Sequence, residues 1–226
     1  MPATAPVFPR IVPLGDAALT LEFGDGIGAG LNARVMAARD RLAGLPGLTD
    51  LVPTYRSLTA HFDPLAVPAT RIHAALEAAA HAPQESTTAG RRWEIPVAFG
   101  GEAGPDLPAV AASTGRSEAE IIATLCALDL RVFLIGFLPG FPYLGELPEW
   151  LRLPRRSTPR TAVPPNSVAI AGAQAAVYPW QSPGGWHLLG RTPLALFDAE
   201  NAERPALLAP GDTVRFVAVA PGASSA

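Results

Sequence analysis

Apolar and polar positions in the first third of the chain repeat with two different periods. Alternation at every second position is typical of a half-buried strand, and repeats of three and four residues are typical of an amphipathic helix. Strand-like patterns cover 18–23, 48–54 and 57–62, and helix-like patterns cover 32–42 and 70–80. The resulting order β-α-β-β-α predicts a small α+β sandwich of the ferredoxin-like, split βαβ type.

Further along the chain, short apolar stretches are interrupted by Pro and Gly. Asp106 stands where it can cap a helix that extends to about residue 112. Ser117 and Glu120 have the spacing of a capping box, which predicts a second helix to about residue 128. Many short strands at close spacing favour a β-barrel or a β-sandwich. These strands are expected over 93–99, 132–135, 167–171, 175–178, 187–190, 194–197 and 213–219.

A polar, aperiodic segment separates the two patterns and predicts two domains. We expect an N-terminal α+β domain over 1–83, a linker over 84–91, a barrel domain over 92–219 and a flexible tail over 220–226. The length of 226 residues is compatible with two unequal domains of this kind.

The basic residues restrict the chemistry, because all 17 of them are arginine and the chain contains no lysine. A phosphate-loop lysine, a lysine nucleophile and a pyridoxal phosphate Schiff base are therefore excluded. An anion would have to be held by arginine or by backbone N–H groups. The formal net charge of −3, without any basic block, disfavours binding to nucleic acid.

The other composition features favour a soluble cytoplasmic protein without a metal site. The sequence has no run of about 18 apolar residues, so no membrane span is expected. Cys126 is the single cysteine, which rules out an internal disulfide. The four histidines are scattered without the spacing of metal ligands.

Aromatic residues alternate with Pro and Gly over the segment 135–145. Proline fixes φ and glycine permits positive φ, so such a loop is stiff and exposes backbone N–H groups. The loop could line a substrate pocket, with Phe137, Pro139, Gly140 and Phe141 as candidate contacts. A tightly packed corner of the barrel explains the same residues.

A second unusual segment, further along the chain, combines small and polar residues with a tryptophan. Gly184 and Gly185 would let the backbone approach a ligand next to Trp186, and Gln174 and Ser182 could supply polar contacts. A Gly-Gly turn between strands accounts for the same glycines. The serine stands outside any Gly-x-Ser-x-Gly motif and has no evident base nearby, so a serine hydrolase is not supported.

Four arginines occur within nine residues, at Arg152, Arg155, Arg156 and Arg160. A guanidinium group can hold a carboxylate or a phosphate through two parallel hydrogen bonds. Arg152 and Arg155 are interpreted as solvated charges that offset nearby acidic residues. Arg160, which lies between a proline and an expected strand, is the candidate with a functional role.

Together these motifs resemble the B-subunit family of 5-oxoprolinase, which is also described as allophanate hydrolase subunit 1 or as the kinase A inhibitor family. The resemblance covers nearly the whole chain. The segments that carry it are Pro13-Leu-Gly-Asp-Ala-Ala-Leu19, Asn32-Ala-Arg34, Val52-Pro-Thr-Tyr-Arg-Ser-Leu58, Phe99-Gly-Gly-Glu-Ala-Gly-Pro-Asp-Leu107, Gly136-Phe-Leu-Pro-Gly-Phe-Pro-Tyr-Leu144, Thr158-Pro-Arg160, Ser182-Pro-Gly-Gly-Trp186 and Pro210-Gly-Asp212.

The resemblance implies an N-terminal α+β domain followed by a cyclophilin-like β-barrel. It also implies a heteromeric assembly in which the A, B and C subunits of 5-oxoprolinase hydrolyse 5-oxoproline, a lactam, to glutamate with cleavage of ATP. Because this chain lacks a phosphate loop, we expect a partner subunit to form most of the ATP-binding site. We also expect the isolated chain to be inactive. Alternative functions are a regulatory protein that inhibits a sensor histidine kinase, and a component of an allophanate or urea-type amidohydrolase.

The reaction implied by the resemblance suggests roles for the candidate residues. Opening a lactam requires a clamp for the substrate carboxylate and stabilisation of developing negative charge. In this hypothesis Arg160 clamps the carboxylate, and Gln174 and Ser182 orient the lactam. The residues expected to bind the substrate, exclude water and offer backbone N–H groups are Phe137, Pro139, Gly140, Phe141, Gly184, Gly185 and Trp186.

One position departs from the family. Members often carry a His-Thr or His-Ser pair where this chain has Cys126-Ala127. Cys126 lies on an apolar helix and is interpreted as a small packed residue rather than a nucleophile. A role of the family's histidine in chemistry or in contacts between subunits would be lost or altered here.

Overall fold

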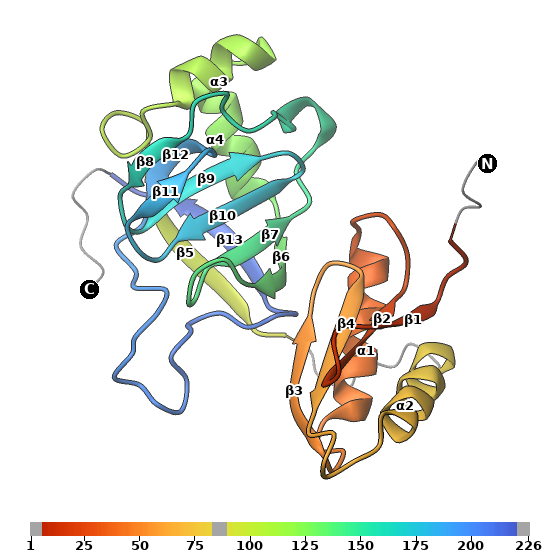
Figure 1. The fold of residues 1–226 in the computed structure, drawn as a ribbon. Helices are drawn as coiled ribbons and strands as arrows, with labels where there is room; N and C mark the ends of the chain where they lie inside the picture. Colours follow the sequence, from red (N-terminus) through yellow and green to blue (C-terminus); the bar gives the residue numbers. More distant parts are fainter. Residues whose placement is uncertain (1–5, 83–89, 221–226) are drawn as a thin grey trace. The chain divides into compact units, whose positions relative to one another are not determined.

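The computed structural model describes residues 6–82 and 90–220. The chain divides into two compact units, Met1–Ala89 and Gly90–Ala226 (Figure 1). Most of the linker expected over 84–91 and of the tail expected over 220–226 lies outside the described residues. No helix in the described part of the chain is long and apolar enough to cross a membrane.

The first unit is a four-stranded antiparallel sheet with two helices. Its elements are β1 (Arg10–Pro13), β2 (Ala18–Glu22), α1 (Ala29–Leu42), β3 (Leu48–Pro53), β4 (Ser57–Phe62) and α2 (Ala69–His81). The strand order is β1-β2-β4-β3. Because β2 and β3 both run antiparallel to the central β4, they are parallel to each other and α1 connects them. This arrangement confirms the split βαβ prediction.

Both helices of the first unit pack against the sheet and against each other. Leu21 of β2 and Leu58 of β4 are fully buried, and they meet Val35 of α1 and Ile72 of α2 in one apolar core. The alternation of apolar residues along the strands therefore marks the face that the helices cover. The buried amide of Asn32 donates a hydrogen bond of 3.0 Å to the carbonyl oxygen of Thr54, which links α1 to the β3–β4 turn.

The second unit contains a closed seven-stranded barrel in the order β10-β7-β6-β13-β5-β12-β9. Neighbouring strands are antiparallel except β13 and β5, which are parallel. Figure 1 shows α3 and α4 against this barrel, where α3 contacts β12 and α4 contacts β13. The elements of the unit are β5 (Arg92–Phe99), α3 (Leu107–Thr114), α4 (Glu118–Ala127), β6 (Leu130–Ile135), β7 (Pro142–Gly145), η1 (Glu149–Leu151), β8 (Arg160–Val163), β9 (Ser167–Ala171), β10 (Gln174–Tyr178), β11 (Ser182–Gly184), β12 (His187–Arg191) and β13 (Thr213–Ala218).

Both faces of the barrel wall are apolar around β9 and β10. Val168 and Ile170 of β9 point into the barrel core, and the intervening Ala169 belongs to a second cluster on the outer face. Val163 of β8 packs in the same outer cluster, and β8 pairs with β11 in a separate two-stranded sheet. Small side chains such as Ala169 therefore leave room for a second layer over the barrel wall.

Several sequence predictions differ from the structure. The strand expected over 194–197 is wrong. Of these four residues only Phe197 makes a β-type contact, which is an isolated bridge to Ala206. Leu196 is nevertheless buried in the barrel core, so its apolar pattern reflects a packed loop. Strands β1, β7, β8 and β11 were not expected, because they are three or four residues long and most contain Pro or Gly.

Candidate active site

The loop before α3 lies against β12 and places Asp106. The backbone N–H of Gly100 donates to the carbonyl oxygen of Leu189, and that of Asp106 donates to the carbonyl oxygen of Leu188, both at 3.0 Å. A Cβ atom at Gly104 would overlap the Leu189 carbonyl, so only glycine permits this close approach. The Gly-rich segment that the resemblance includes thus serves to bring one carboxylate onto the barrel.

Asp106 is the centre of a buried ion-pair network, although it was expected to cap α3. Its carboxylate forms no capping hydrogen bond and instead accepts two bonds from Arg160, at 2.7 and 2.9 Å. Arg156 donates a third bond at 2.8 Å, and the backbone N–H of Leu188 a fourth at 2.7 Å. Asp106 is 4% exposed, so these four bonds replace its hydration.

The network keeps Asp106 ionised. Burial alone would raise the pKa of this carboxyl group. The hydrogen bonds from Arg160 and Leu188 and the positive charges of Arg160 and Arg156 outweigh burial and lower the pKa of Asp106 below its usual value. The arginine fork that the sequence assigned to a substrate carboxylate is therefore engaged by a carboxylate of the chain itself.

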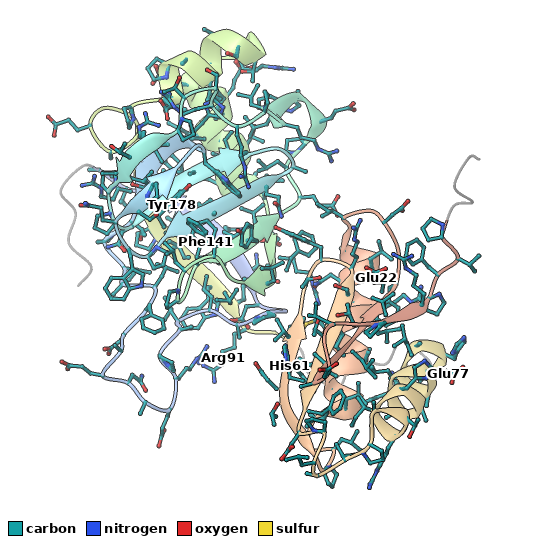
Figure 2. All side chains as sticks on the ribbon, in the orientation of Figure 1. Glu22, His61, Glu77, Arg91, Phe141 and Tyr178 are labelled. Atoms are coloured by element: carbon teal, nitrogen blue, oxygen red, sulfur yellow. The ribbon has the colours of Figure 1, made fainter. Side chains whose placement is uncertain are left out.

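Beside this network lies an aromatic cluster on the outer face of the barrel, consisting of Phe137, Phe141, Tyr143, Tyr178 and Trp186. Phe141 is its centre: its ring lies 5.0 Å from Tyr143 and from Tyr178, 5.4 Å from Phe137 and 6.1 Å from Trp186, all edge to face. Figure 2 shows Phe141 and Tyr178 together over the barrel. Phe141 is 1% exposed, so it packs in a core and does not line an open substrate pocket.

Tyr178 joins the aromatic cluster to the arginines. Burial raises the pKa of Tyr178 to about 12, although the nearby charges of Arg155 and Arg160 and a hydrogen bond from the Trp186 backbone oppose the increase. Its hydroxyl group is therefore neutral at physiological pH. A Cβ atom at Gly184 would overlap the Tyr178 hydroxyl, which explains the need for glycine in β11.

Two of the predicted substrate contacts in the aromatic loop, Phe137 and Pro139, are exposed. Phe137 is 61% exposed and has a φ of 71°, an uncommon value for a residue other than glycine. The carbonyl oxygen of Pro139 accepts a 3.2 Å hydrogen bond from the indole of Trp180. Gly140 has a φ of 76°, and a Cβ atom there would press on Phe197. Of the predicted substrate contacts in this loop, Phe137 and Pro139 are thus the side chains that a ligand or partner can reach.

The polar candidates lie on different strands. Ser182 on β11 is buried, and its hydroxyl group has no hydrogen-bond partner within the described residues. Gln174 begins β10, opposite Gly145 of β7. The carbonyl oxygen of Gly185 accepts a 2.7 Å bond from the Arg156 backbone, so this glycine fixes the arginine segment. The catalytic roles of Ser182 and Gln174 stay predictions.

Cys126 is half-buried on α4 against the barrel core, as a small packed residue would be. Burial raises the pKa of its thiol group, which disfavours the reactive thiolate. Among the described residues, no three His, Cys, Asp or Glu side chains come close enough to hold a metal ion.

The role of Asp106 and the position of Arg156 were not predicted from the sequence. Asp106 precedes an apolar helix, and that signal favours an N-cap over a partner 50 residues away along the chain. A buried carboxylate requires partners, and four arginines within nine residues were the available signal. That signal could not tell which arginines Asp106 would meet.

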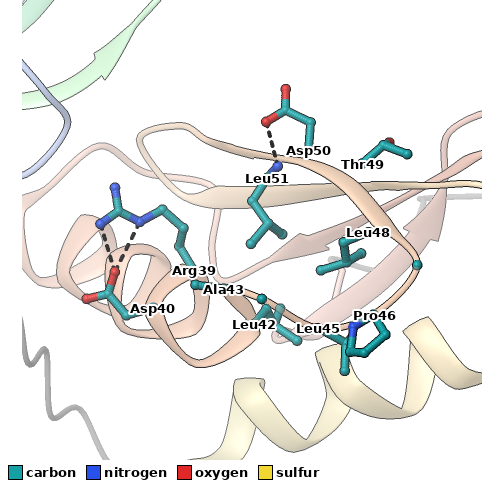
Figure 3. A pocket seen from close by; sticks show the side chains of 12 residues that line it. Arg39, Asp40, Leu42, Ala43, Leu45, Pro46, Leu48, Thr49, Asp50 and Leu51 are labelled. Carbon is teal, nitrogen blue, oxygen red and sulfur yellow. Dashed lines mark hydrogen bonds and ion pairs between the residues drawn. The ribbon is translucent and has the colours of Figure 1, made fainter. Parts of the chain in front are cut away.

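The first unit also has a cavity, of about 570 Å³, beside the α1–β3 loop (Figure 3). Arg39 donates to the carboxylate of the adjacent Asp40, at 2.7 and 3.1 Å. Asp50 accepts a bond from the Leu51 backbone. These charged groups already have partners from the chain. The cavity is therefore a weaker candidate for a ligand site than the second unit.

Comparison with known proteins relates most of the chain to one group. Residues 9–208 match the family described as carboxyltransferase domain, subdomain C and D. The B subunit of 5-oxoprolinase from Escherichia coli O157:H7 is 40% identical over 211 residues, which cover 92% of this chain and 95% of that protein. The B subunit of 5-oxoprolinase from Bacillus subtilis is 38% identical over 223 residues, covering 93% and 92%.

Solved structures extend the comparison. The crystal structure of TTHA0988 superposes with a TM-score of 0.81 at 40% identity and covers 92% of this chain. The chain spans only 41% of TTHA0988. The urea amidolyase of Kluyveromyces lactis shares the fold, with a TM-score of 0.73 at 18% identity, and this chain corresponds to 15% of that protein.

Proposed function

Because this chain belongs to the family of 5-oxoprolinase B subunits, which carries the carboxyltransferase domain, subdomain C and D, we propose that it is the B subunit of a heteromeric 5-oxoprolinase. The enzyme hydrolyses 5-oxo-L-proline to L-glutamate with cleavage of ATP. The observation that carries this conclusion is the 40% identity to a 5-oxoprolinase B subunit over 95% of that protein's length. The match extends over both compact units of the chain.

We assign the partner roles to the A and C subunits of 5-oxoprolinase, and ATP to a site formed mainly by a partner. The absence of lysine from this chain supports that assignment, because phosphate loops use a lysine to reach the terminal phosphates. This chain would then contribute arginines, backbone N–H groups and an apolar enclosure to the substrate side. Shielding by aromatic residues strengthens electrostatic interactions in a site from which water is excluded.

The proposed role of Arg160 takes a definite form beside Asp106. Each terminal nitrogen of its guanidinium group donates one hydrogen bond to Asp106, so a substrate carboxylate would bind the remaining N–H groups of Arg160. Replacing Arg160 by Ala in the assembled complex separates two roles. Loss of turnover with intact assembly supports a substrate clamp. Normal turnover with reduced thermal stability would leave Arg160 as a structural partner of Asp106.

An omission series tests whether the chain acts as a B subunit. The purified chain is mixed with the A and C subunits in all combinations, and 5-oxoproline-dependent release of ADP is measured. We expect turnover with all three and none by this chain alone, because the chain has no phosphate-binding loop. Full activity of the two partners without this chain would contradict the assignment.

A further inference from the structure

A cleft of about 470 Å³ opens on the second unit where the segment between η1 and β8 passes the start of β12. We call it the arginine cleft. It is a separate feature from the aromatic cluster, and no sequence motif predicts a ligand for it. The side chains that can meet a ligand there are Ser113, Arg155, Arg156, Ser157, Thr158 and His187.

Positive charge exceeds negative charge around the arginine cleft. Arg156 and the adjacent Arg160 share the single carboxylate of Asp106. Arg155 is exposed and forms no ion pair with any residue in 6–82 or 90–220. The cleft and its border therefore carry three positive guanidinium groups and one negative carboxylate, which is already bonded. Arg155 lies close enough to Tyr178 for its charge to act on that hydroxyl, so the positive surplus borders the aromatic cluster.

The wall of the cleft also offers hydrogen-bond donors that the described chain does not use. The backbone N–H groups and the hydroxyl groups of Ser157 and Thr158 form no hydrogen bond within the described residues. The Nε atom of Arg156 also has no partner there, but it is buried and does not count among the donors of the wall. Successive backbone N–H groups next to arginines are the donor set that proteins use for phosphate and carboxylate oxygens.

His187, at the start of β12, also lines the cleft. Its Nε2 lies 2.8 Å from the carbonyl oxygen of Pro154. A carbonyl oxygen can only accept, so Nε2 carries the proton and Nδ1 is left as an acceptor in the neutral ring. A ligand that retains an acidic hydrogen, such as hydrogen phosphate, could donate it to Nδ1. The cleft therefore combines several donors with one acceptor.

We propose that the arginine cleft binds the oxyanion group of a small molecule, a phosphate or a carboxylate, with Arg155 as its principal ligand. This site goes beyond the proposed function, which assigns the nucleotide mainly to a partner and places no ligand at residues 155–158 or His187. Phosphate and carboxylate share the recognition chemistry of bidentate contacts to guanidinium and contacts to N–H and hydroxyl groups. The probe that binds will show whether the ligand's oxyanion is a phosphate or a carboxylate.

The test is calorimetric titration of the full chain with inorganic phosphate and, separately, with 5-oxoproline. We expect one of them to bind, and replacing Arg155 by Gln to weaken that binding about tenfold, as the loss of a charge-assisted contact implies. The control is Arg191→Gln, which removes the same charge from an exposed position of β12 and should leave binding unchanged. Phosphate binding assigns the cleft to a phosphate group, and 5-oxoproline binding assigns it to a carboxylate.

Binding of neither probe would overturn the proposal, and so would an equal loss for both variants, which would indicate a response to net charge alone. A second measurement locates the ligand independently of any substitution. In amide nuclear magnetic resonance spectra, the binding probe should shift the signals of Ser157 and Thr158 most. Shifts centred on the cavity of the first unit would also overturn the proposal. Both measurements use the chain without partners, so an inactive complex would not affect them.

Discussion

Replacing Asp106 by Asn is the sharpest test of the buried network. The substitution keeps the shape of the side chain and removes its charge, which leaves Arg156 and Arg160 without their anion. Removing one partner of a buried ion pair costs about 3–5 kcal/mol. The side chain of Asp106 is 6% exposed, and those of Arg160 and Arg156 are 23% and 33% exposed. Because the two arginines are partly solvated, we expect the free energy of unfolding to fall by about 3 kcal/mol, the lower end of this range.

The matched control is Asp129→Asn. Asp129 also bridges two arginines, Arg92 and Arg215, at 2.8 and 3.0 Å, but its side chain is 43% exposed. Exposed pairs contribute about 1 kcal/mol or less, so the same change in charge should have little effect there. In thermal denaturation followed by circular dichroism, we expect Asp106→Asn to lower the Tm of the second unit by about 10 °C. Equal Tm values for the two variants would refute the reasoning.

The pH dependence of the Asp106 effect has a fixed sign. The pKa of Asp106 is lower in the folded chain than the ordinary value of 3.8, so the folded state binds fewer protons than the unfolded state near that pH. Its contribution to stability is therefore present above pH 3.8 and is lost as the pH falls through the lower, folded pKa. The difference in unfolding free energy between the natural chain and Asp106→Asn should shrink below that pH. A difference that grows on acidification would contradict the assignment.

Two further predictions concern the aromatic cluster. Phe141→Ala should reduce the free energy of unfolding by about 3–5 kcal/mol, because Phe141 is buried, whereas Phe137→Ala should cost far less because Phe137 is 61% exposed. Urea denaturation measures both losses, and similar values would show that Phe141 is not the centre of the cluster. Since the pKa of Tyr178 rises from 10.0 to about 12, the stability that this shift provides is complete below pH 10.0 and is lost as the pH rises toward 12. A chain with Tyr178→Phe should lack this alkaline loss, which unfolding at several alkaline pH values would reveal, and an unchanged profile would contradict it.

The periodic elements could be predicted from the sequence because their patterns follow from burial on one face. Strand β4 alternates Leu58, Ala60 and Phe62 toward the helices, and the capping box at Ser117 and Glu120 begins α4 as expected. Both signals are local, so neighbouring residues suffice to identify them.

The site residues were harder to predict because their partners are distant in the sequence. Asp106 and Arg160 are 54 positions apart and meet only because the loop before α3 lies on β12. Phe141 was a candidate for substrate contact, but the alanines of β9 and β10 make room for it as a packed residue. Aromatic and Gly-rich composition alone does not distinguish a pocket wall from a second core.

The most direct test of the central claim is the formation of glutamate from 5-oxoproline. The complex reconstituted from this chain with the A and C subunits should release glutamate only when ATP is present, and omission of this chain should abolish the product. The chain alone should release none, because it lacks a phosphate loop and contains no lysine. Glutamate formation by the isolated chain, or undiminished formation by the partners without it, would contradict the account.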